Sequence, residues 1–321
     1  MFNQDAWASN LDKFFLGIFI LALFSFGFIT LTNFVYARLI SVALTFGALV
    51  IILIRKKVWV KPKLHKPHIK MFASMSIPYA WMTILYSANE RIDMVMLHSL
   101  YSSHETGVYN AAYRILDAAM MYLWIILPFF FAKLAHFDSS DEDKDKLIKN
   151  GTAITALPLL FLSGFAFFYG EKMFFMFTDS TPEDLQSMKL YFVILSISLL
   201  THGFFTIMST YLTSNGYTRY VNNIIFLSIL LNITLNLYFI PEYGGYAAAI
   251  TTLCSSLFLS MSYLVYIKLY TNVSFPWDTW IKLLFIGSIY FLTIYVGKHF
   301  QINWIVTTIT AGVIGGGLSL V

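Results

Sequence analysis

Charged residues are scarce in this sequence. Of its 321 residues, 12% are charged and 58% are hydrophobic, whereas soluble domains carry about 25% charged residues. A soluble fold of this size has too little interior to hide so much apolar surface. The composition therefore argues against a soluble protein and predicts an all-α polytopic membrane protein.

Cysteine and catalytic motifs are also missing. The single cysteine, Cys254, rules out an intramolecular disulfide framework. The first residues lack the basic region of a secretory signal peptide, so we expect membrane insertion through the first helices themselves. The sequence contains no nucleotide-binding glycine loop, nucleophile elbow or zinc motif. We therefore expect a protein that is not an enzyme, without cofactor, metal or nucleic-acid partner.

Long apolar runs are what the sequence does contain. They lack the two-residue alternation of barrel strands, which favours helices, and a membrane-spanning helix needs about 20 such residues. We expect about ten transmembrane helices, near residues 14–34, 36–54, 71–100, 107–135, 151–170, 187–212, 218–240, 245–270, 280–297 and 303–321.

Lysine and arginine are unevenly distributed between these expected helices. Seven lie in the linker 55–70 and four in the loop 133–149. On the expected topology, 15 of the 21 lie on one side of the membrane and four on the other. Because cytoplasmic loops are enriched in these residues, we expect both segments, and both termini, to lie in the cytoplasm.

Polar residues gather inside the expected helices 71–100 and 107–135. Charges at such depth usually face a bundle interior or a wet cavity. At about 1.5 Å per residue, Arg91 and Arg114 lie about 13 Å and about 11 Å below the outer surface. The candidates in this charged hairpin are Asn89, Glu90, Arg91, Asp93, Tyr109, Asn110, Arg114 and Asp117.

Two interpretations of the charged hairpin stay open. In the structural one, Arg91 pairs with Asp117 and Arg114 pairs with Asp93, because buried arginines are often satisfied in this way. In the functional one, Arg91 and Arg114 bind an anionic headgroup, since the planar guanidinium donates bidentate hydrogen bonds to phosphate. Glu90, Asp93 or Asp117 then couples transport to an ion.

Three further polar residues interrupt the later apolar runs. His202 is either a titratable group near neutral pH or a hydrogen-bonded packing residue. Asn232 and Asn236 share a helix face, and such amides tie helices together in membranes or line a cavity. The expected cavity lining comprises Asn89, Tyr109, Asn110, His202, Asn232 and Asn236.

Two segments carry recognisable motifs. Residues 76–115 place Asp93 before a short outer turn, and a Gly-x-Tyr-x-x-Ala-x-Arg pattern ending at Arg114 follows. Residues 232–252 combine an asparagine-rich helix, an Ile-Pro-x-Tyr-Gly turn and an alanine-rich helix start. These segments resemble the polysaccharide-export (O-antigen) flippases of the multidrug/oligosaccharidyl-lipid/polysaccharide exporter superfamily, over about residues 60–270.

The resemblance implies a two-lobed fold that rocks about a central cavity, with six helices in each lobe and two extra helices at the end. It assigns residues 1–54 to the last two helices of an N-terminal lobe and residues 55–70 to a basic cytoplasmic linker. It assigns 71–270 to a C-terminal six-helix lobe and 271–321 to two additional helices. Because the family has six helices before the linker, we expect the first lobe to be incomplete in this chain.

The resemblance also implies a function. We expect a flippase in the bacterial cytoplasmic (inner) membrane that moves a polyprenyl-diphosphate-linked oligosaccharide for surface polysaccharide synthesis, including lipopolysaccharide. Its partners would be membrane lipids, a polysaccharide polymerase, glycosyltransferases and H+ or Na+ as the coupling ion. The alternatives are a drug/cation antiporter of the same superfamily, which predicts an acidic cavity, a membrane-embedded polysaccharide polymerase, and a structural membrane scaffold.

Overall fold

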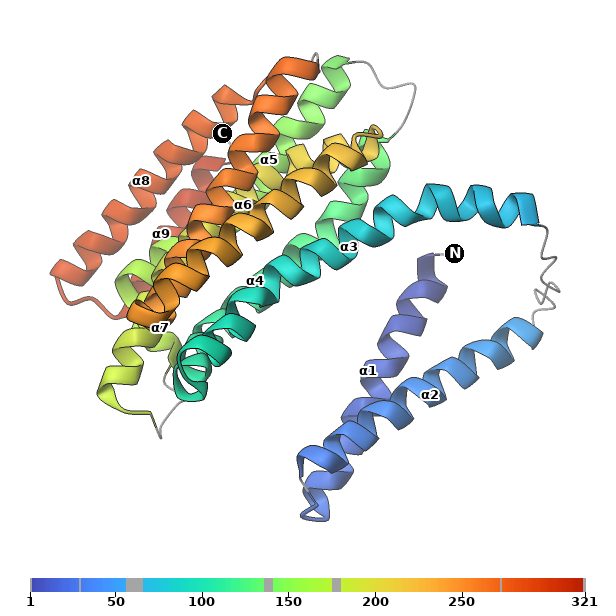
Figure 1. The fold of residues 1–321 in the computed structure, drawn as a ribbon. Coiled ribbons are helices and arrows are strands. Elements are labelled where there is room, and N and C mark those ends of the chain that lie inside the picture. Colours follow the sequence, from blue (N-terminus) through green and yellow to red (C-terminus); the bar gives the residue numbers. More distant parts are fainter. Residues whose placement is uncertain are drawn as a thin grey trace. The chain divides into compact units, whose positions relative to one another are not determined.

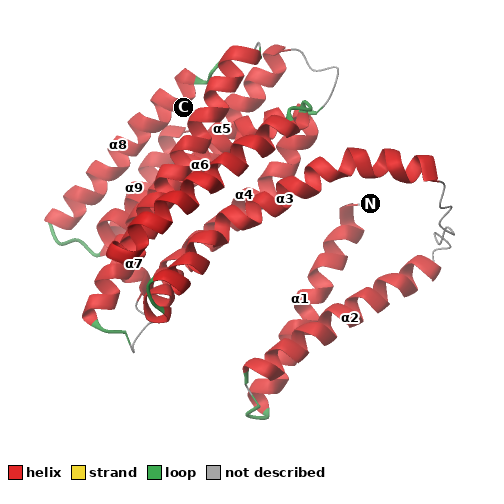
Figure 2. Ribbon diagram, viewed as in Figure 1, coloured by secondary structure: helices red, strands yellow, loops and turns green. Residues whose placement is uncertain are grey.

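The computed structural model describes residues 2–28, 30–55, 66–135, 141–174, 180–271 and 273–319, and every regular element in them is a helix (Figure 2). The chain divides into two compact units, Met1–Lys70 and Met71–Val321. Most of the linker 55–70 lies outside the described residues. In order, the helices are α1 (Phe2–Ser25), α2 (Leu31–Arg55), α3 (Lys66–Leu100), α4 (Ser103–Leu134), α5 (Asp141–Tyr169), the short 3-10 helix η1 (Gly170–Phe174), α6 (Pro182–Ser214), α7 (Thr218–Tyr270), α8 (Trp277–His299) and α9 (Trp304–Ser319) (Figure 1).

The first unit is a hairpin of α1 and α2 whose boundary differs from the expected one. We expected a helix over 14–34, but α1 ends at Ser25 and the chain turns at Gly27, which has a φ of 70°. The apolar run hid this turn, since phenylalanines flank the glycine on both sides. On α2, Arg38 pairs with Asp12 of α1 at 2.7 Å, and Ser41 donates a hydrogen bond to the same carboxylate.

α7 is two helices joined at a kink. Gly244 departs from helical geometry, with φ 54° and ψ −133°, at a turn that the sequence predicts. Hydrogen bonds link Ser228 to the carbonyl of Ser255 and Tyr220 to that of Ser262, so the two halves run antiparallel. The kink separates the expected helices 218–240 and 245–270. The total of about ten membrane spans stays a prediction.

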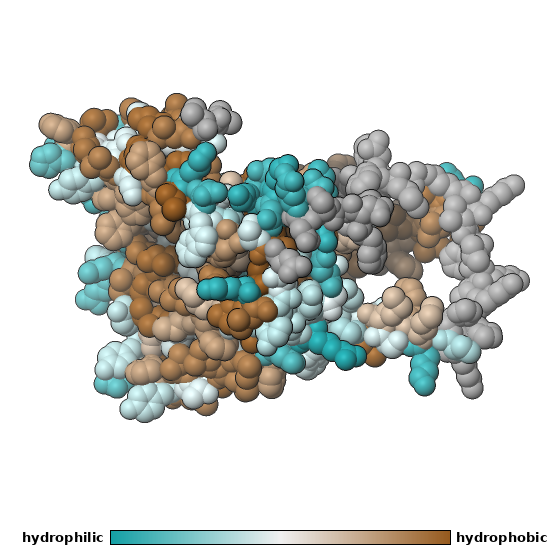
Figure 3. Space-filling view, turned by 90° about the horizontal axis from the view of Figure 1, so that it is seen from above, coloured by the Kyte–Doolittle hydropathy of each residue, from teal (hydrophilic) through white to brown (hydrophobic). Residues whose placement is uncertain are grey.

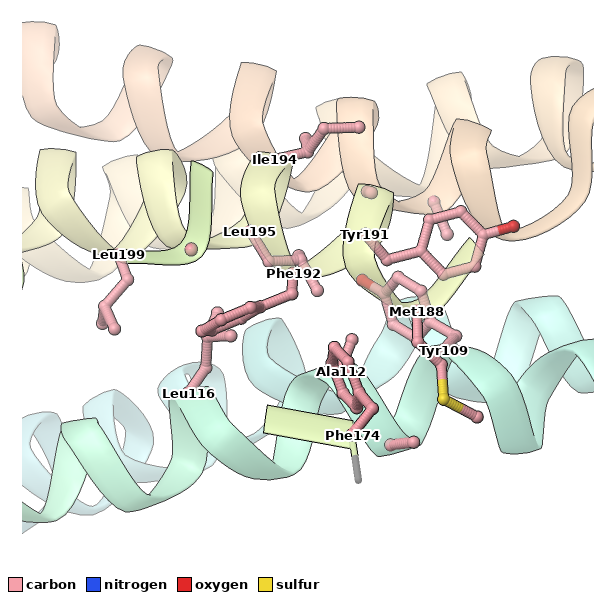
Figure 4. Close-up of a cluster of buried hydrophobic side chains, with 14 of the residues drawn as sticks. Tyr109, Ala112, Leu116, Phe174, Met188, Tyr191, Phe192, Ile194, Leu195 and Leu199 are labelled. Carbon is pink, nitrogen blue, oxygen red and sulfur yellow. The ribbon is translucent and has the colours of Figure 1, made fainter. Parts of the chain in front are cut away.

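α6 forms the centre of the second unit. It packs against α4, α5 and α7, and its buried side chains run along most of its length. In Figure 4, Tyr109 of α4 meets Tyr191 of α6, and the two rings lie 5.9 Å apart. Phe174 of η1 packs edge-on against Phe192 of α6 at the same distance. These contacts fix the helices that line the cavity described below.

The α5–α6 contact depends on small residues. Thr155 donates a hydrogen bond of 2.7 Å to the carbonyl of Gly203, and Ser163 donates one of 2.8 Å to that of Ser196. A Cβ at Gly203 would lie 2.6 Å from the side chain of Leu159 and 3.1 Å from the backbone of Thr155. Small residues allow this close approach of backbones, as is typical of membrane helices.

The outer surface is apolar. Large hydrophobic side chains such as Ile125, Tyr238 and Phe72 are at least 73% exposed, and hydrophobic side chains cover much of the face seen in Figure 3. Six of the described helices are long and apolar enough to cross a membrane. Exposed apolar surface on membrane-length helices is the arrangement that a lipid environment requires.

Replacing Gly203 with alanine tests the α5–α6 contact. The added methyl group would push against Leu159 and Thr155, and overpacking of this kind costs about 1–3 kcal/mol. We expect a lower melting temperature in detergent than for the wild type. Gly312→Ala is the matched control, because no atom lies within 4 Å of the position that its added methyl group would take. Equal melting temperatures for the two variants would contradict the close contact.

Candidate functional site

A cavity of about 750 Å³ opens between α3, α4 and α6, a volume within the range of about 300–1,000 Å³ typical of ligand sites. α4 supplies apolar and aromatic side chains, α3 supplies both apolar and polar ones, and α6 supplies His202 and a row of hydroxyl groups. The lining comprises Met82, Thr83, Tyr86, Ser87, Glu90, Met120, Trp124, Leu127, Pro128, Phe131, His202, Thr206, Ser209, Thr210 and Thr213.

A second space of about 80 Å³ adjoins this cavity and reaches α7. Five residues line both spaces: Tyr86, Glu90, Met120, Trp124 and His202. The smaller space adds polar groups from the charged hairpin, from α6 and from α7: Asn89, Asp117, Ser198, Thr252 and Ser256. We refer to the two spaces together as the polar cavity.

Helical spacing places these side chains on common faces. Tyr86 and Glu90 are four residues apart on α3, and Tyr113, Asp117 and Trp124 follow one another at spacings of four and seven on α4. Such residues lie one above another on a helix. Trp124 and Tyr86 were absent from the sequence-based candidates, although their spacing from Asp117 and Glu90 was a usable signal.

Arg91 forms one of the two ion pairs that we considered. Its Nη2 lies 3.1 Å from Oδ2 and 3.2 Å from Oδ1 of Asp117, and its guanidinium lies 5.5 Å from the centre of the Tyr113 ring. The other expected pair, between Arg114 and Asp93, does not occur among the described residues. Arg114 is instead exposed, outside the lining of the polar cavity.

Asp93 is the most deeply buried carboxylate of the hairpin, at 2% exposure. Its Oδ2 accepts hydrogen bonds from the hydroxyl groups of Tyr109 and Thr252, and its Oδ1 accepts one of 2.9 Å from the Met94 amide. The donors come from α4, α7 and α3 itself, so this carboxylate joins three helices. These three donors satisfy the oxygen atoms of the Asp93 carboxylate, so its hydrogen bonding does not depend on an ion pair with Arg114.

Asn232 and Asn236 lie inside the α7 hairpin and are both buried. Asn236 donates a hydrogen bond of 2.8 Å to the side-chain oxygen of Asn232, and the Thr251 hydroxyl donates to Asn236. This is the tying role that we considered for these amides. Neither residue lines the polar cavity, whereas Asn89 and His202 do. Tyr109 is buried against Asp93, and Asn110 is half-buried outside the lining.

Comparisons with known proteins agree with this architecture. No protein-family model matches the sequence. An uncharacterized membrane protein of Methanocaldococcus jannaschii is 25% identical over 182 residues, which make up 57% of this chain and 42% of that protein. A structure of lipid II flippase MurJ in an inward closed conformation matches with a TM-score of 0.74 and 17% identity, over 98% of this chain and 65% of that one. The chain shares the MurJ fold.

The match to the MurJ fold establishes the general architecture of this chain. The chain is an all-helical, multi-pass membrane protein whose structure matches that of a transporter. It spans less than two thirds of the length of either matched protein. The polar cavity lies within the second unit, Met71–Val321, so its geometry does not depend on where the first unit lies.

Replacing Tyr109 with phenylalanine tests the Asp93 cluster. The change removes one donor from a buried carboxylate, and an unsatisfied buried group costs about 1–3 kcal/mol. We expect a lower melting temperature, and we expect most of the loss to vanish when Asp93 is already alanine, since interacting residues are not additive. Tyr238→Phe, at a tyrosine that is 76% exposed, controls for the loss of a hydroxyl group. An equal effect of Tyr109→Phe in both backgrounds would contradict the proposed hydrogen bond.

Proposed function

We propose that this chain is the larger part of a flippase for a polyprenyl-diphosphate-linked oligosaccharide, acting in bacterial surface polysaccharide synthesis. The observation that carries the proposal is the polar cavity, which lies inside membrane-length helices of a MurJ-like fold. A sugar headgroup is too polar to cross hydrocarbon, because each hydroxyl group left without a hydrogen bond there would cost several kcal/mol. A wet cavity can carry the headgroup while the lipid tail stays in the bilayer.

The proposed cycle is alternating access. Two lobes would rock about a fixed site in the membrane, with H+ or Na+ as the coupling ion and Glu90, Asp93 and Asp117 as its candidate acceptors. Both termini would face the cytoplasm, and polysaccharide polymerases and glycosyltransferases would supply or consume the substrate. Membership of the exporter superfamily, and of its O-antigen branch, is part of the same proposal and is supported by the shared fold.

The two arginines enter the proposal differently. Arg91 already holds Asp117, so it would bind a diphosphate only by exchanging one anion for another. Arg114 is exposed and forms no ion pair within the described residues. Of the two, Arg114 is therefore the better candidate for a direct headgroup ligand, and Arg91 the better candidate for positioning Asp117.

A drug/cation antiporter is the second candidate. It is favoured by one observation: the described lining of the polar cavity contains Glu90 and Asp117 but neither lysine nor arginine. An acidic cavity suits a cationic substrate better than a diphosphate. The flippase proposal needs an anionic group of the substrate to contact Arg114. The antiporter proposal needs no contact between the substrate and a lysine or arginine.

Complementation tests the flippase proposal. The intact protein would be expressed in a strain that lacks its surface-polysaccharide flippase, and surface polysaccharide would be measured by immunoblotting at matched membrane levels. We expect restoration by the wild type, a loss of at least tenfold with Arg114→Ala and a smaller loss with Arg91→Ala. Arg219→Ala, an exposed arginine at the start of α7, is the matched control.

Two results would count against the proposal. If strains with several different repeat-unit sugars all fail to regain polysaccharide, the flippase proposal is wrong for this protein. If the same cells instead become resistant to lipophilic cations, the antiporter replaces it. Restoration that survives Arg114→Ala would keep the flippase and remove the proposed role of that arginine.

A further inference from the structure

Glu90 carries the uncompensated charge of the polar cavity. Two carboxylates, those of Glu90 and Asp117, line the smaller space, and Asp117 is held by Arg91 at 3.1 Å. Glu90 forms neither a hydrogen bond nor an ion pair with any side chain that the structure describes. It lines both spaces and is half-buried. With Asp117 paired to Arg91, Glu90 is the carboxyl group of the described lining that has no counter-charge from the protein.

His202 does not supply this counter-charge above pH 7.5. It is the one imidazole in the described lining, and an ordinary histidine, with a pKa of about 6.5, is largely neutral above pH 7.5. A carboxylate inside a membrane protein is costly without a partner. The partner of Glu90 must therefore come from what enters the cavity.

Aromatic rings surround the same space. Tyr86 lies one helical turn before Glu90, and Trp124 and Tyr113 face the space from α4. The faces of such rings attract cations, tryptophan most strongly. A carboxylate beside several aromatic rings is a combination that suits an ammonium group and repels a phosphate.

We propose that the polar cavity binds the ammonium group of an amine-bearing ligand, with Glu90 as the counter-charge and Tyr86 and Trp124 as aromatic walls. The rest of the lining indicates the body of the ligand. Met82, Leu127 and Phe131 offer apolar surface, and Thr206 and Thr210 on α6 offer a polar edge. The ligand is therefore an amphipathic amine.

Two sources can supply such an amine. One is an amino sugar carried on a lipid-linked oligosaccharide, and this source alone rests on the proposed flippase function. The other is a free lipophilic cation. The shared chemistry is the ammonium group, and it can be tested without measuring transport, so a failure here is distinct from a failure of the flippase proposal.

The charge of the cavity can be measured by cysteine labelling. Cys254→Ser removes the cysteine of this sequence, and Ser87→Cys then places one thiol in the cavity lining, on an exposed residue one turn from Glu90. A cationic (trimethylammonioethyl) and an anionic (sulfonatoethyl) methanethiosulfonate would be compared at pH 8 in membrane vesicles. A unit charge at about 6 Å in water changes each rate about threefold in opposite directions, so the cation-to-anion ratio changes about tenfold.

Three variants make this comparison decisive. We expect the rate ratio to fall about tenfold in Glu90→Gln, by the same estimate, and to be kept in Glu90→Asp, which retains the charge. Glu142→Gln is the matched control and should leave the ratio unchanged, because Glu142 is 78% exposed and pairs with Lys146. Elution as a single peak in gel filtration confirms that each variant is folded. A ratio that is equal in wild type and Glu90→Gln would overturn the assignment of the charge.

Ligand protection identifies the amine. Labelling of Ser87→Cys by a neutral maleimide would be timed with a β-1,4-glucosamine tetramer, its fully N-acetylated counterpart, or tetrabutylammonium. Protection by the glucosamine tetramer but not by the acetylated one assigns an amino-sugar ligand, and protection by tetrabutylammonium alone assigns a free cation. Both effects should vanish in Glu90→Gln. Protection by neither amine, or protection that is independent of Glu90, would overturn the proposal.

Discussion

The constraint on which this structure depends is that a polar group within a bilayer must find its partner inside the protein, because hydrocarbon offers none. Asp93 meets this constraint by accepting hydrogen bonds from Tyr109, Thr252 and the Met94 amide. The cluster joins α3, α4 and α7 near the turn between α3 and α4. Asn236 does the same between the two halves of α7.

One turn earlier on α3, polar side chains do not have partners of this kind inside the protein. Glu90 and His202 face a cavity of about 750 Å³, and the structure describes no hydrogen bond for either side chain. Ionisable groups within membrane helices normally have partners, so half-buried ones that have none and line a cavity indicate a place for water or a ligand. The hairpin therefore has two parts: an end where Asp93 links the helices by hydrogen bonds, and an end that contributes Glu90 and Asp117 to the polar cavity.

The sequence predicted most of the helices because hydropathy and a few breakers determine them, and the turn at Gly244 was visible in the Ile-Pro-x-Tyr-Gly pattern. The end of α1 was missed because Gly27 lies within an unbroken apolar run. The Arg91–Asp117 pair was among the expected options, since both residues lie at similar depth. The partners of Asp93 were not, because the rotation of each helix decides them, and spacing along one helix does not contain that information. Trp124 was overlooked since a tryptophan in an apolar run resembles a lipid-facing residue.

Footprinting with hydroxyl radicals, generated from water by X-rays in native membranes, tests the central claim that the cavity is wet. Methionines report on it, because Met82 and Met120 line the cavity, whereas Met96 and Met208 are buried in the apolar core at 9% and 1% exposure. If water fills the cavity, Met82 and Met120 will be oxidised well above Met96 and Met208 in the same sample. Protection of all four methionines to the same degree would mean that no water reaches this space, and the claim of a polar, substrate-bearing cavity would be contradicted.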